Sequence, residues 1–129
     1  MKRGTIIIEP ARIAVALSSD GTVWMTAEEI ATIFHTTAAG IERYIKRLFA
    51  TGELNEREVK TEEMRLRNDR RYAVEYYNLD MIIALCFRID TPASKAFRRW
   101  IAEQAVRSLK REEVPPLILR IESRNETAN

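Results

Sequence analysis

The amino-acid sequence predicts an α+β fold, a winged-helix-like helix-turn-helix domain with small β-hairpins and about four helices. Three observations predict it: short β-branched runs beside turn residues, helix-start signals before apolar stripes, and an arginine-rich hairpin after the second helix. A chain of 129 residues suits one small domain. We expect residues 1–113 to form this domain and residues 114–129 to form a C-terminal extension with a short strand.

Composition excludes several classes of protein. Hydrophobic residues make up 46% and charged residues 31% of the chain, as in ordinary folded soluble proteins. The apolar runs are too short to span a membrane, and the start MKRGTIIIEP does not resemble a signal peptide. A single cysteine cannot form an internal disulfide, which suits a reducing compartment. A cytoplasmic, bacterial-type protein is expected.

The N-terminal part is predicted to be β-structure. Thr5–Ile8 is a β-branched run that indicates a strand. Arg12–Leu17 and Thr22–Met25 flank the turn-rich spacer Ser18–Gly21, so we predict that these two segments pair as a hairpin.

Two helices are predicted next. Thr26 and Glu29 have the spacing of a capping box, in which each side chain accepts a hydrogen bond from the other residue's backbone N–H. The second helix is predicted over about residues 38–50, and Gly52 suits a left-handed conformation beyond its end.

The segment TAEEIATIFHTTAAGIERYI has the layout of a helix-turn-helix. Ala31 is the small residue that lets the second helix pack closely against the first, and Ile41 is the apolar anchor ten residues further on. The turn of this motif has one residue with positive φ. His35 stands there in place of the usual glycine, and histidine tolerates this conformation better than most residues.

The outward face of the second helix would enter the major groove of double-stranded DNA. Arg43 can form a bidentate contact with guanine, Lys46 and Arg47 suit phosphate, and Glu42 can accept a hydrogen bond from cytosine. The alternative is an ordinary solvated helix face. The candidate DNA-binding residues of this helix are Thr36, Thr37, Ala39, Glu42, Arg43, Lys46 and Arg47.

A second hairpin is predicted from Met64–Arg67 and Tyr72–Tyr77 around Asn68-Asp69-Arg70. It resembles the wing of a winged helix, and its arginines are candidates for phosphate or minor-groove contact, although a solvated surface is again the alternative. Those arginines are Arg65, Arg67, Arg70 and Arg71. A further basic stretch, Lys95–Arg111, carries six basic residues against one glutamate. It is interpreted first as a solvated helix face and second as a phosphate contact.

Two more helices and a short strand complete the prediction. Asn78 is expected to cap a helix that ends near Arg88, and Thr91-Pro92 to begin a helix that ends near Arg111. Leu117–Ile121 is predicted to be a strand. We expect Trp24, Trp100 and Tyr77 in the core, and Asp80 in an ion pair with Arg88 or Arg98. The buried stripe of the last helix is expected to consist of Phe97, Trp100, Ile101, Ala105 and Leu109.

Several stretches resemble a known family. VWMTAEEIATIF, LFATGEL, YYNLDMIIALCFRI and FRRWIAEQ are similar, in this order, to the RhuM-type virulence protein N-terminal domain and more distantly to Bro-N and KilA-N domains. The resemblance covers roughly Ile6 to Leu109 and implies a DNA-associated role. The chain departs from the family pattern at Asn68–Arg71, where Asp-Gly-Lys is preferred.

We therefore expect this protein to bind DNA and to regulate transcription or mobile-element genes. The alternative is a protein-interaction adaptor associated with a toxin or effector. No enzymatic activity, cofactor or metal is expected, since Cys86 falls on an apolar helical face and metal-ligand spacing is absent from the sequence.

A homodimer is expected because one helix-turn-helix makes few contacts. One interpretation is that Thr5–Ile8 or Leu117–Ile121 pairs within the chain; the alternative is that Leu117–Ile121, after Pro115-Pro116, reaches across to a partner.

Overall fold

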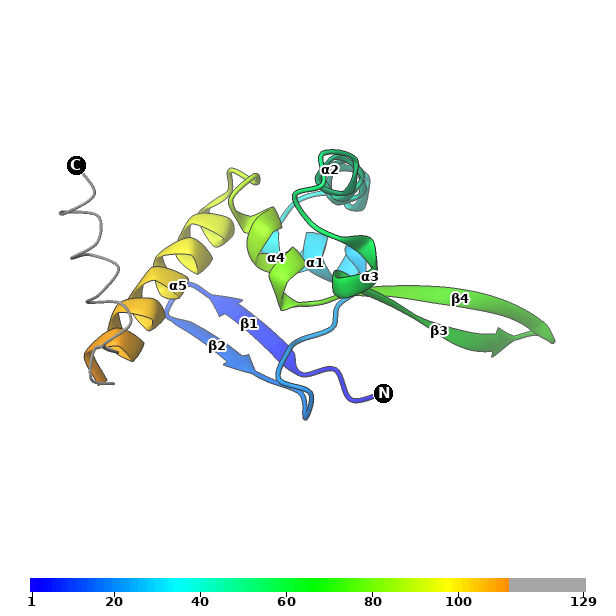
Figure 1. The fold of residues 1–129 in the computed structure, drawn as a ribbon, viewed down its shortest axis with the longest axis horizontal. Coiled ribbons are helices and arrows are strands. Elements are labelled where there is room, and N and C mark those ends of the chain that lie inside the picture. Colours follow the sequence, from blue (N-terminus) through cyan, green and yellow to red (C-terminus); the bar gives the residue numbers. More distant parts are fainter. Residues whose placement is uncertain (112–129) are drawn as a thin grey trace, which may run out of the picture. The chain divides into compact units, whose positions relative to one another are not determined.

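The computed structural model describes residues 1–111, which form an α+β fold with five helices and two antiparallel β-hairpins (Figure 1). The chain divides into two compact units, Met1–Arg98 and Arg99–Asn129, and the boundary falls inside the last helix. The expected domain boundary at residues 113 and 114 and the expected strand Leu117–Ile121 lie outside the described residues.

The first hairpin pairs β1 (Thr5–Glu9) with β2 (Arg12–Ala16), joined by the two residues Pro10 and Ala11. The predicted strand Thr5–Ile8 is thus confirmed, and it pairs within the chain. The predicted pairing of Arg12–Leu17 with Thr22–Met25 is wrong, because the nearer strand β1 occupies that edge of β2.

Thr22–Met25 instead leads into the second hairpin. Met25 and Tyr77 exchange two backbone hydrogen bonds, of 3.0 and 2.8 Å, and this isolated bridge joins the segment before the first helix to the end of β4. The hairpin itself consists of β3 (Lys60–Arg67) and β4 (Arg70–Tyr77), longer than predicted. We term this hairpin the wing, and Figure 1 shows it extending away from the helices α1–α4.

Helices α1 (Ala27–Phe34) and α2 (Ala38–Ala50) pack against each other as the predicted helix pair. Both hydrogen bonds of the Thr26–Glu29 capping box are present. His35 has φ 56°, so the predicted left-handed residue between the helices is confirmed. Ala31 and Ile41 are both buried, as the motif requires.

Three further helices follow. α3 (Glu56–Val59), capped by Asn55, was not predicted, because four residues are too few to display a helical period. α4 (Leu79–Cys86) begins after the predicted cap Asn78, whose side chain accepts a hydrogen bond from the Met81 backbone N–H. α5 (Pro92–Arg111) has the predicted bounds.

The core of the first unit includes the rings of Phe34 and Phe97, with centroids 5.7 Å apart and planes inclined by 56°. Tyr77 is buried, as expected, whereas Trp24 and Trp100 are only half-buried. The predicted stripe of α5 is wrong beyond Ile101, since Ala105 and Leu109 are exposed.

The ion pairs predicted for Asp80 are also wrong. Arg88 reaches the carboxylate of Glu53, which follows α2 in the sequence. Arg98 donates to the backbone oxygens of Cys86 and Ile89, which lie at and just after the end of α4. Both guanidiniums therefore have partners that only the folded chain brings near.

Candidate nucleic-acid interface

The start of α2 is built by threonine caps. Thr37 has extended backbone angles, and its Oγ1 accepts a hydrogen bond of 3.1 Å from the Gly40 backbone N–H. The preceding Thr36 is half-buried, and its backbone N–H donates to the carbonyl of Ala31 at 2.9 Å. Thr37 thus has a structural role at the helix start, and its hydroxyl proton is still able to donate to a ligand.

The rotation of α2 is set by its apolar side chains. Ile41, Ile45 and Leu48 are buried. Positions 39, 43 and 46 follow one another at helical spacing on the opposite side. The side chains that α2 exposes include five of the predicted contact residues: Ala39, Glu42, Arg43, Lys46 and Arg47. We term Ala39, Arg43, Lys46 and Arg47 the basic face of α2.

The cations of this face have no carboxylate partner among residues 1–111. Arg43, Lys46 and Arg47 form no ion pair in this part of the chain, whereas Lys60 binds both Glu56 and Glu75, at 3.0 and 3.2 Å. Arg47 lies over the ring of Tyr44, with 5.9 Å between its Cζ and the ring centroid. Stacking on an aromatic ring leaves a guanidinium's charge and edge donors available.

The wing arginines are divided between two faces by the strand register. Arg65 pairs with Tyr72, and Arg67 pairs with Arg70, so these four side chains share one face of the hairpin. Arg71 pairs with Leu66 and lies on the opposite face. Arg67, Arg70 and Arg71 are exposed and form no ion pair with any described residue, so three of the four predicted arginines are available for contact.

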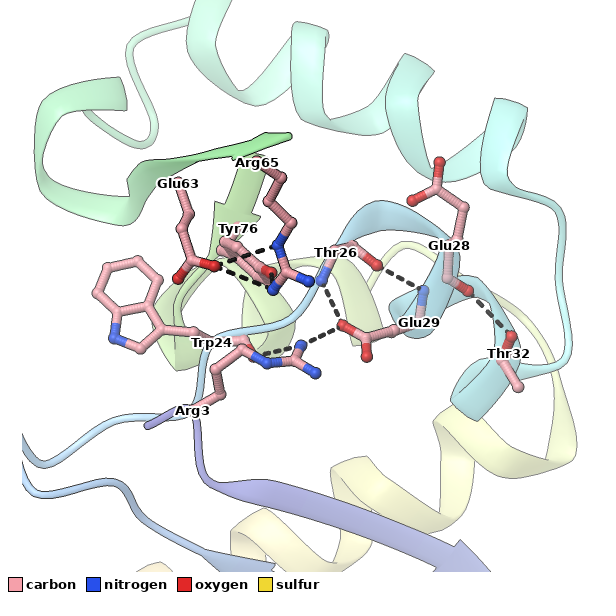
Figure 2. Close-up of polar contacts among 9 residues, drawn as sticks. All are labelled: Arg3, Trp24, Thr26, Glu28, Glu29, Thr32, Glu63, Arg65 and Tyr76. Atoms are coloured by element: carbon pink, nitrogen blue, oxygen red, sulfur yellow. Dashed lines mark hydrogen bonds and ion pairs between the residues drawn. The ribbon is translucent and has the colours of Figure 1, made fainter. Parts of the chain in front are cut away.

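The fourth, Arg65, is engaged within the wing itself (Figure 2). Its guanidinium donates to the hydroxyl of Tyr76 at 2.8 Å and to the carboxylate of Glu63 at 3.1 Å. Both bonds hold the side chain back along the hairpin, away from the tip. Of the four predicted wing arginines, Arg65 is therefore the one whose guanidinium already has partners within the hairpin.

A residue that the sequence did not single out joins the wing to the helix-turn-helix. The guanidinium of Arg3 lies 5.1 Å from the centre of the Tyr76 ring and forms an ion pair with Glu29 (Figure 2). Burial disfavours the charged form of Glu29, but hydrogen bonds from Arg3 and from the Thr26 backbone outweigh this cost and lower the pKa of the carboxyl. The same glutamate thus completes the α1 capping box and anchors the segment before β1.

An acidic cleft of about 380 Å³ lies between α2 and β4. Its walls include the carboxylates of Glu28, Glu42 and Glu75, and the buried ring of Tyr77. Burial and the hydrogen bond to Glu75 raise the pKa of the Tyr77 hydroxyl, so it stays protonated. Glu42 of α2 and four residues of β4 line this cleft, and its negative charge disfavours a phosphate inside it. Only Glu42 was identified from the sequence, because the other two carboxylates reach the cleft through tertiary packing.

The remaining candidates for chemistry are few. Cys86 is fully buried, and burial raises the pKa of its thiol to about 11, which suppresses the reactive thiolate. Among residues 1–111, no group of three His, Cys, Asp or Glu side chains is arranged to hold a metal ion. Within the same residues, no helix combines the length and the apolar character needed to cross a membrane.

Comparisons of this chain with protein-family models, with curated proteins and with solved structures find no match.

Proposed function

We propose that this protein binds double-stranded DNA through the basic face of α2 and the wing. The observation that carries the proposal is that the basic face of α2 and three wing arginines, Arg67, Arg70 and Arg71, are exposed and have no carboxylate partner among the described residues. Unneutralised cations on a nearly neutral chain suit a polyanion, because each phosphate contact releases a condensed counterion.

In this proposal α2 lies in the major groove. Ala39 permits close approach, Arg43 contacts guanine, and Glu42 at the edge of the cleft accepts a hydrogen bond from cytosine. Lys46 and Arg47 contact phosphates, as do the hydroxyls of Thr36 and Thr37. Arg67, Arg70 and Arg71 contact the backbone from the wing. A role in regulating transcription or mobile-element genes follows from sequence-preferring binding, and a homodimer would double the contacts.

A salt series tests the proposal. The affinity for a random duplex, followed by fluorescence anisotropy, should fall with salt at a log–log slope of roughly −0.9 for each phosphate contacted. Arg43→Ala and Lys46→Ala, each made alone, should weaken binding and make the slope shallower. Arg12→Ala removes the same charge from the β1–β2 hairpin, where Arg12 already pairs with Glu9, and should leave both unchanged. A slope near zero for the unaltered protein would contradict DNA binding.

A protein-interaction module is the second candidate function. The acidic cleft favours it, because three carboxylates around Tyr77 suit a basic segment of a partner protein. The two candidates respond differently to substitution. The double variant Glu28→Gln with Glu75→Gln would weaken the binding of a basic protein partner. It would maintain or strengthen the binding of DNA.

A further inference from the structure

Near the tip, the face of the wing opposite Arg65 is apolar and exposed, whereas the next pair on this face toward the base, Glu62 with Glu75, is acidic. Met64 pairs with Ala73 and Leu66 pairs with Arg71, so these four side chains lie on one face of the hairpin. Leu66 is 67% exposed and Met64 is 61% exposed, the highest values for any large hydrophobic side chain among residues 1–111. Two such neighbours on a projecting ribbon indicate a binding surface, because exposed apolar strands otherwise favour aggregation.

The charges on the tip side of this apolar surface favour a polyanion as the partner of Leu66. Arg67 and Arg70 form the last pair of the ladder, and Arg71 lies beside Leu66. None of these three arginines has an ion pair within the described residues. A second copy of the wing would bring like charges together at the tip, which disfavours pairing between two wings. A nucleic-acid backbone supplies the opposite charge on both sides of an inserted ribbon.

Apolar side chains bind a nucleic acid where two neighbouring base pairs are unstacked and leave a gap between them. Proteins that bind the minor groove insert leucine, methionine and similar residues between base pairs, and arginines beside these wedges contact the phosphates. Leu66 is two residues from the turn at Asn68-Asp69, so it is near the end of the hairpin that reaches furthest from the helices (Figure 1).

We propose that the wing enters the minor groove of double-stranded DNA and that Leu66 inserts as a wedge between two base pairs. Met64 covers the unstacked base edges behind it, and Arg67, Arg70 and Arg71 hold the flanking phosphates. Insertion kinks the duplex toward the major groove. This inference rests on the proposed function, and it adds that the protein bends the DNA that it binds.

The test measures binding and bending separately. A duplex of about 30 base pairs carries a donor and an acceptor dye at its ends, and energy transfer reports its bend while anisotropy reports affinity. The unaltered protein should bend the duplex by an angle on the order of 20–90°. Leu66→Ala should lose most of this bend and keep the salt slope, because no phosphate contact is removed. Leu17→Ala, which shortens another exposed leucine in the first unit, is the matched control and should bend like the unaltered protein.

Each result decides a different point. Tight, salt-dependent binding without a bend would overturn the wedge and leave the proposed function standing. An equal bend with Leu66→Ala would also overturn the wedge. Absence of binding to any duplex would overturn the proposed function and the wedge with it. Sedimentation of the free protein tests whether this face binds a second copy of the chain. Self-association that is abolished by Leu66→Ala would assign the face to that second copy and overturn the wedge.

Discussion

The guanidinium of Arg65 donates a hydrogen bond of 2.8 Å to the hydroxyl of Tyr76, on the same face of the wing. The ring of Tyr76 is in turn covered by Arg3, which pairs with Glu29 of the α1 capping box. One chain of contacts therefore links the wing to the start of the helix-turn-helix, and Arg65 takes part in this chain while the other wing arginines do not.

Arg70→Ala and Arg65→Ala should affect DNA binding differently. Arg70 is at the tip without an ion pair among the described residues, so its loss should make the log–log salt slope shallower by about one contact. Arg65 is engaged with Tyr76 and Glu63, and its loss should leave the slope unchanged. Anisotropy at several salt concentrations measures both. An equal change of slope in the two variants would show that Arg65 also meets phosphate.

Acid should weaken the fold partly through Glu29. Its pKa is lowered in the folded state, since the hydrogen bonds from Arg3 and the Thr26 backbone outweigh its burial. The resulting stabilisation is present above the ordinary pKa of 4.5 and is lost as the pH falls through the lower folded value. Urea midpoints between neutral pH and about pH 3 should therefore fall more steeply for the unaltered protein than for Glu29→Gln. If the urea midpoints of the two proteins fell in parallel with pH, Glu29 would not contribute to the loss of stability in acid.

Phe97→Ala should destabilise the fold more than Trp100→Ala. Phe97 is completely buried against Phe34, and truncation of such a ring costs about 3–5 kcal/mol through lost burial and the cavity left behind. Trp100 is half-buried, so its loss should cost less than a core position. Thermal and urea unfolding measure both, and Phe97→Leu provides a milder variant where Phe97→Ala does not fold. The reverse order would place the main contact of α5 at Trp100.

Asp69→Gly should stabilise the wing. Asn68 and Asp69 form a two-residue turn with φ values of 52° and 61°, and a two-residue hairpin with both φ values positive favours Asn-Gly. Relief of the left-handed strain at a non-glycine residue is expected to gain up to about 1 kcal/mol. Asp69→Val is the opposing variant and should lose stability, because a β-branched residue resists positive φ. Unfolding midpoints of the two variants should lie on opposite sides of the unaltered protein.

The full chain is expected to form a homodimer. The strand expected to reach the partner, Leu117–Ile121, lies outside the described residues, whereas β1 pairs with β2 within the chain. Light scattering should give a dimer for the full chain and a monomer for a chain that ends at Glu113. In the dimer the two α2 helices should be about 34 Å apart, one turn of B-DNA. If both chains are monomers, the predicted homodimer is wrong. If both are dimers, the strand is not needed for dimer formation.

Features decided by neighbours in the sequence were predictable. The Thr26–Glu29 capping box, the positive φ of His35 and the Asn78 cap each depend on residues within one helical turn. The wing was also predictable, since its strands are joined by two residues and its register follows from the turn. These local interactions survive in many tertiary contexts, so the sequence by itself determines the helix starts, the helix-turn-helix and the hairpin that follows it.

Features decided by distant contacts were not predictable. Thr22–Met25 carries strand-forming residues, but Met25 finds its backbone partner in Tyr77, far along the chain. The same cause separates Arg65 from the other wing arginines, since Tyr76 becomes its partner only once the hairpin forms. Strand edges and long charged side chains accept many partners of similar energy. Only the tertiary structure decides which of them comes within hydrogen-bonding distance, and with that choice it decides which charges are left without a partner among the described residues.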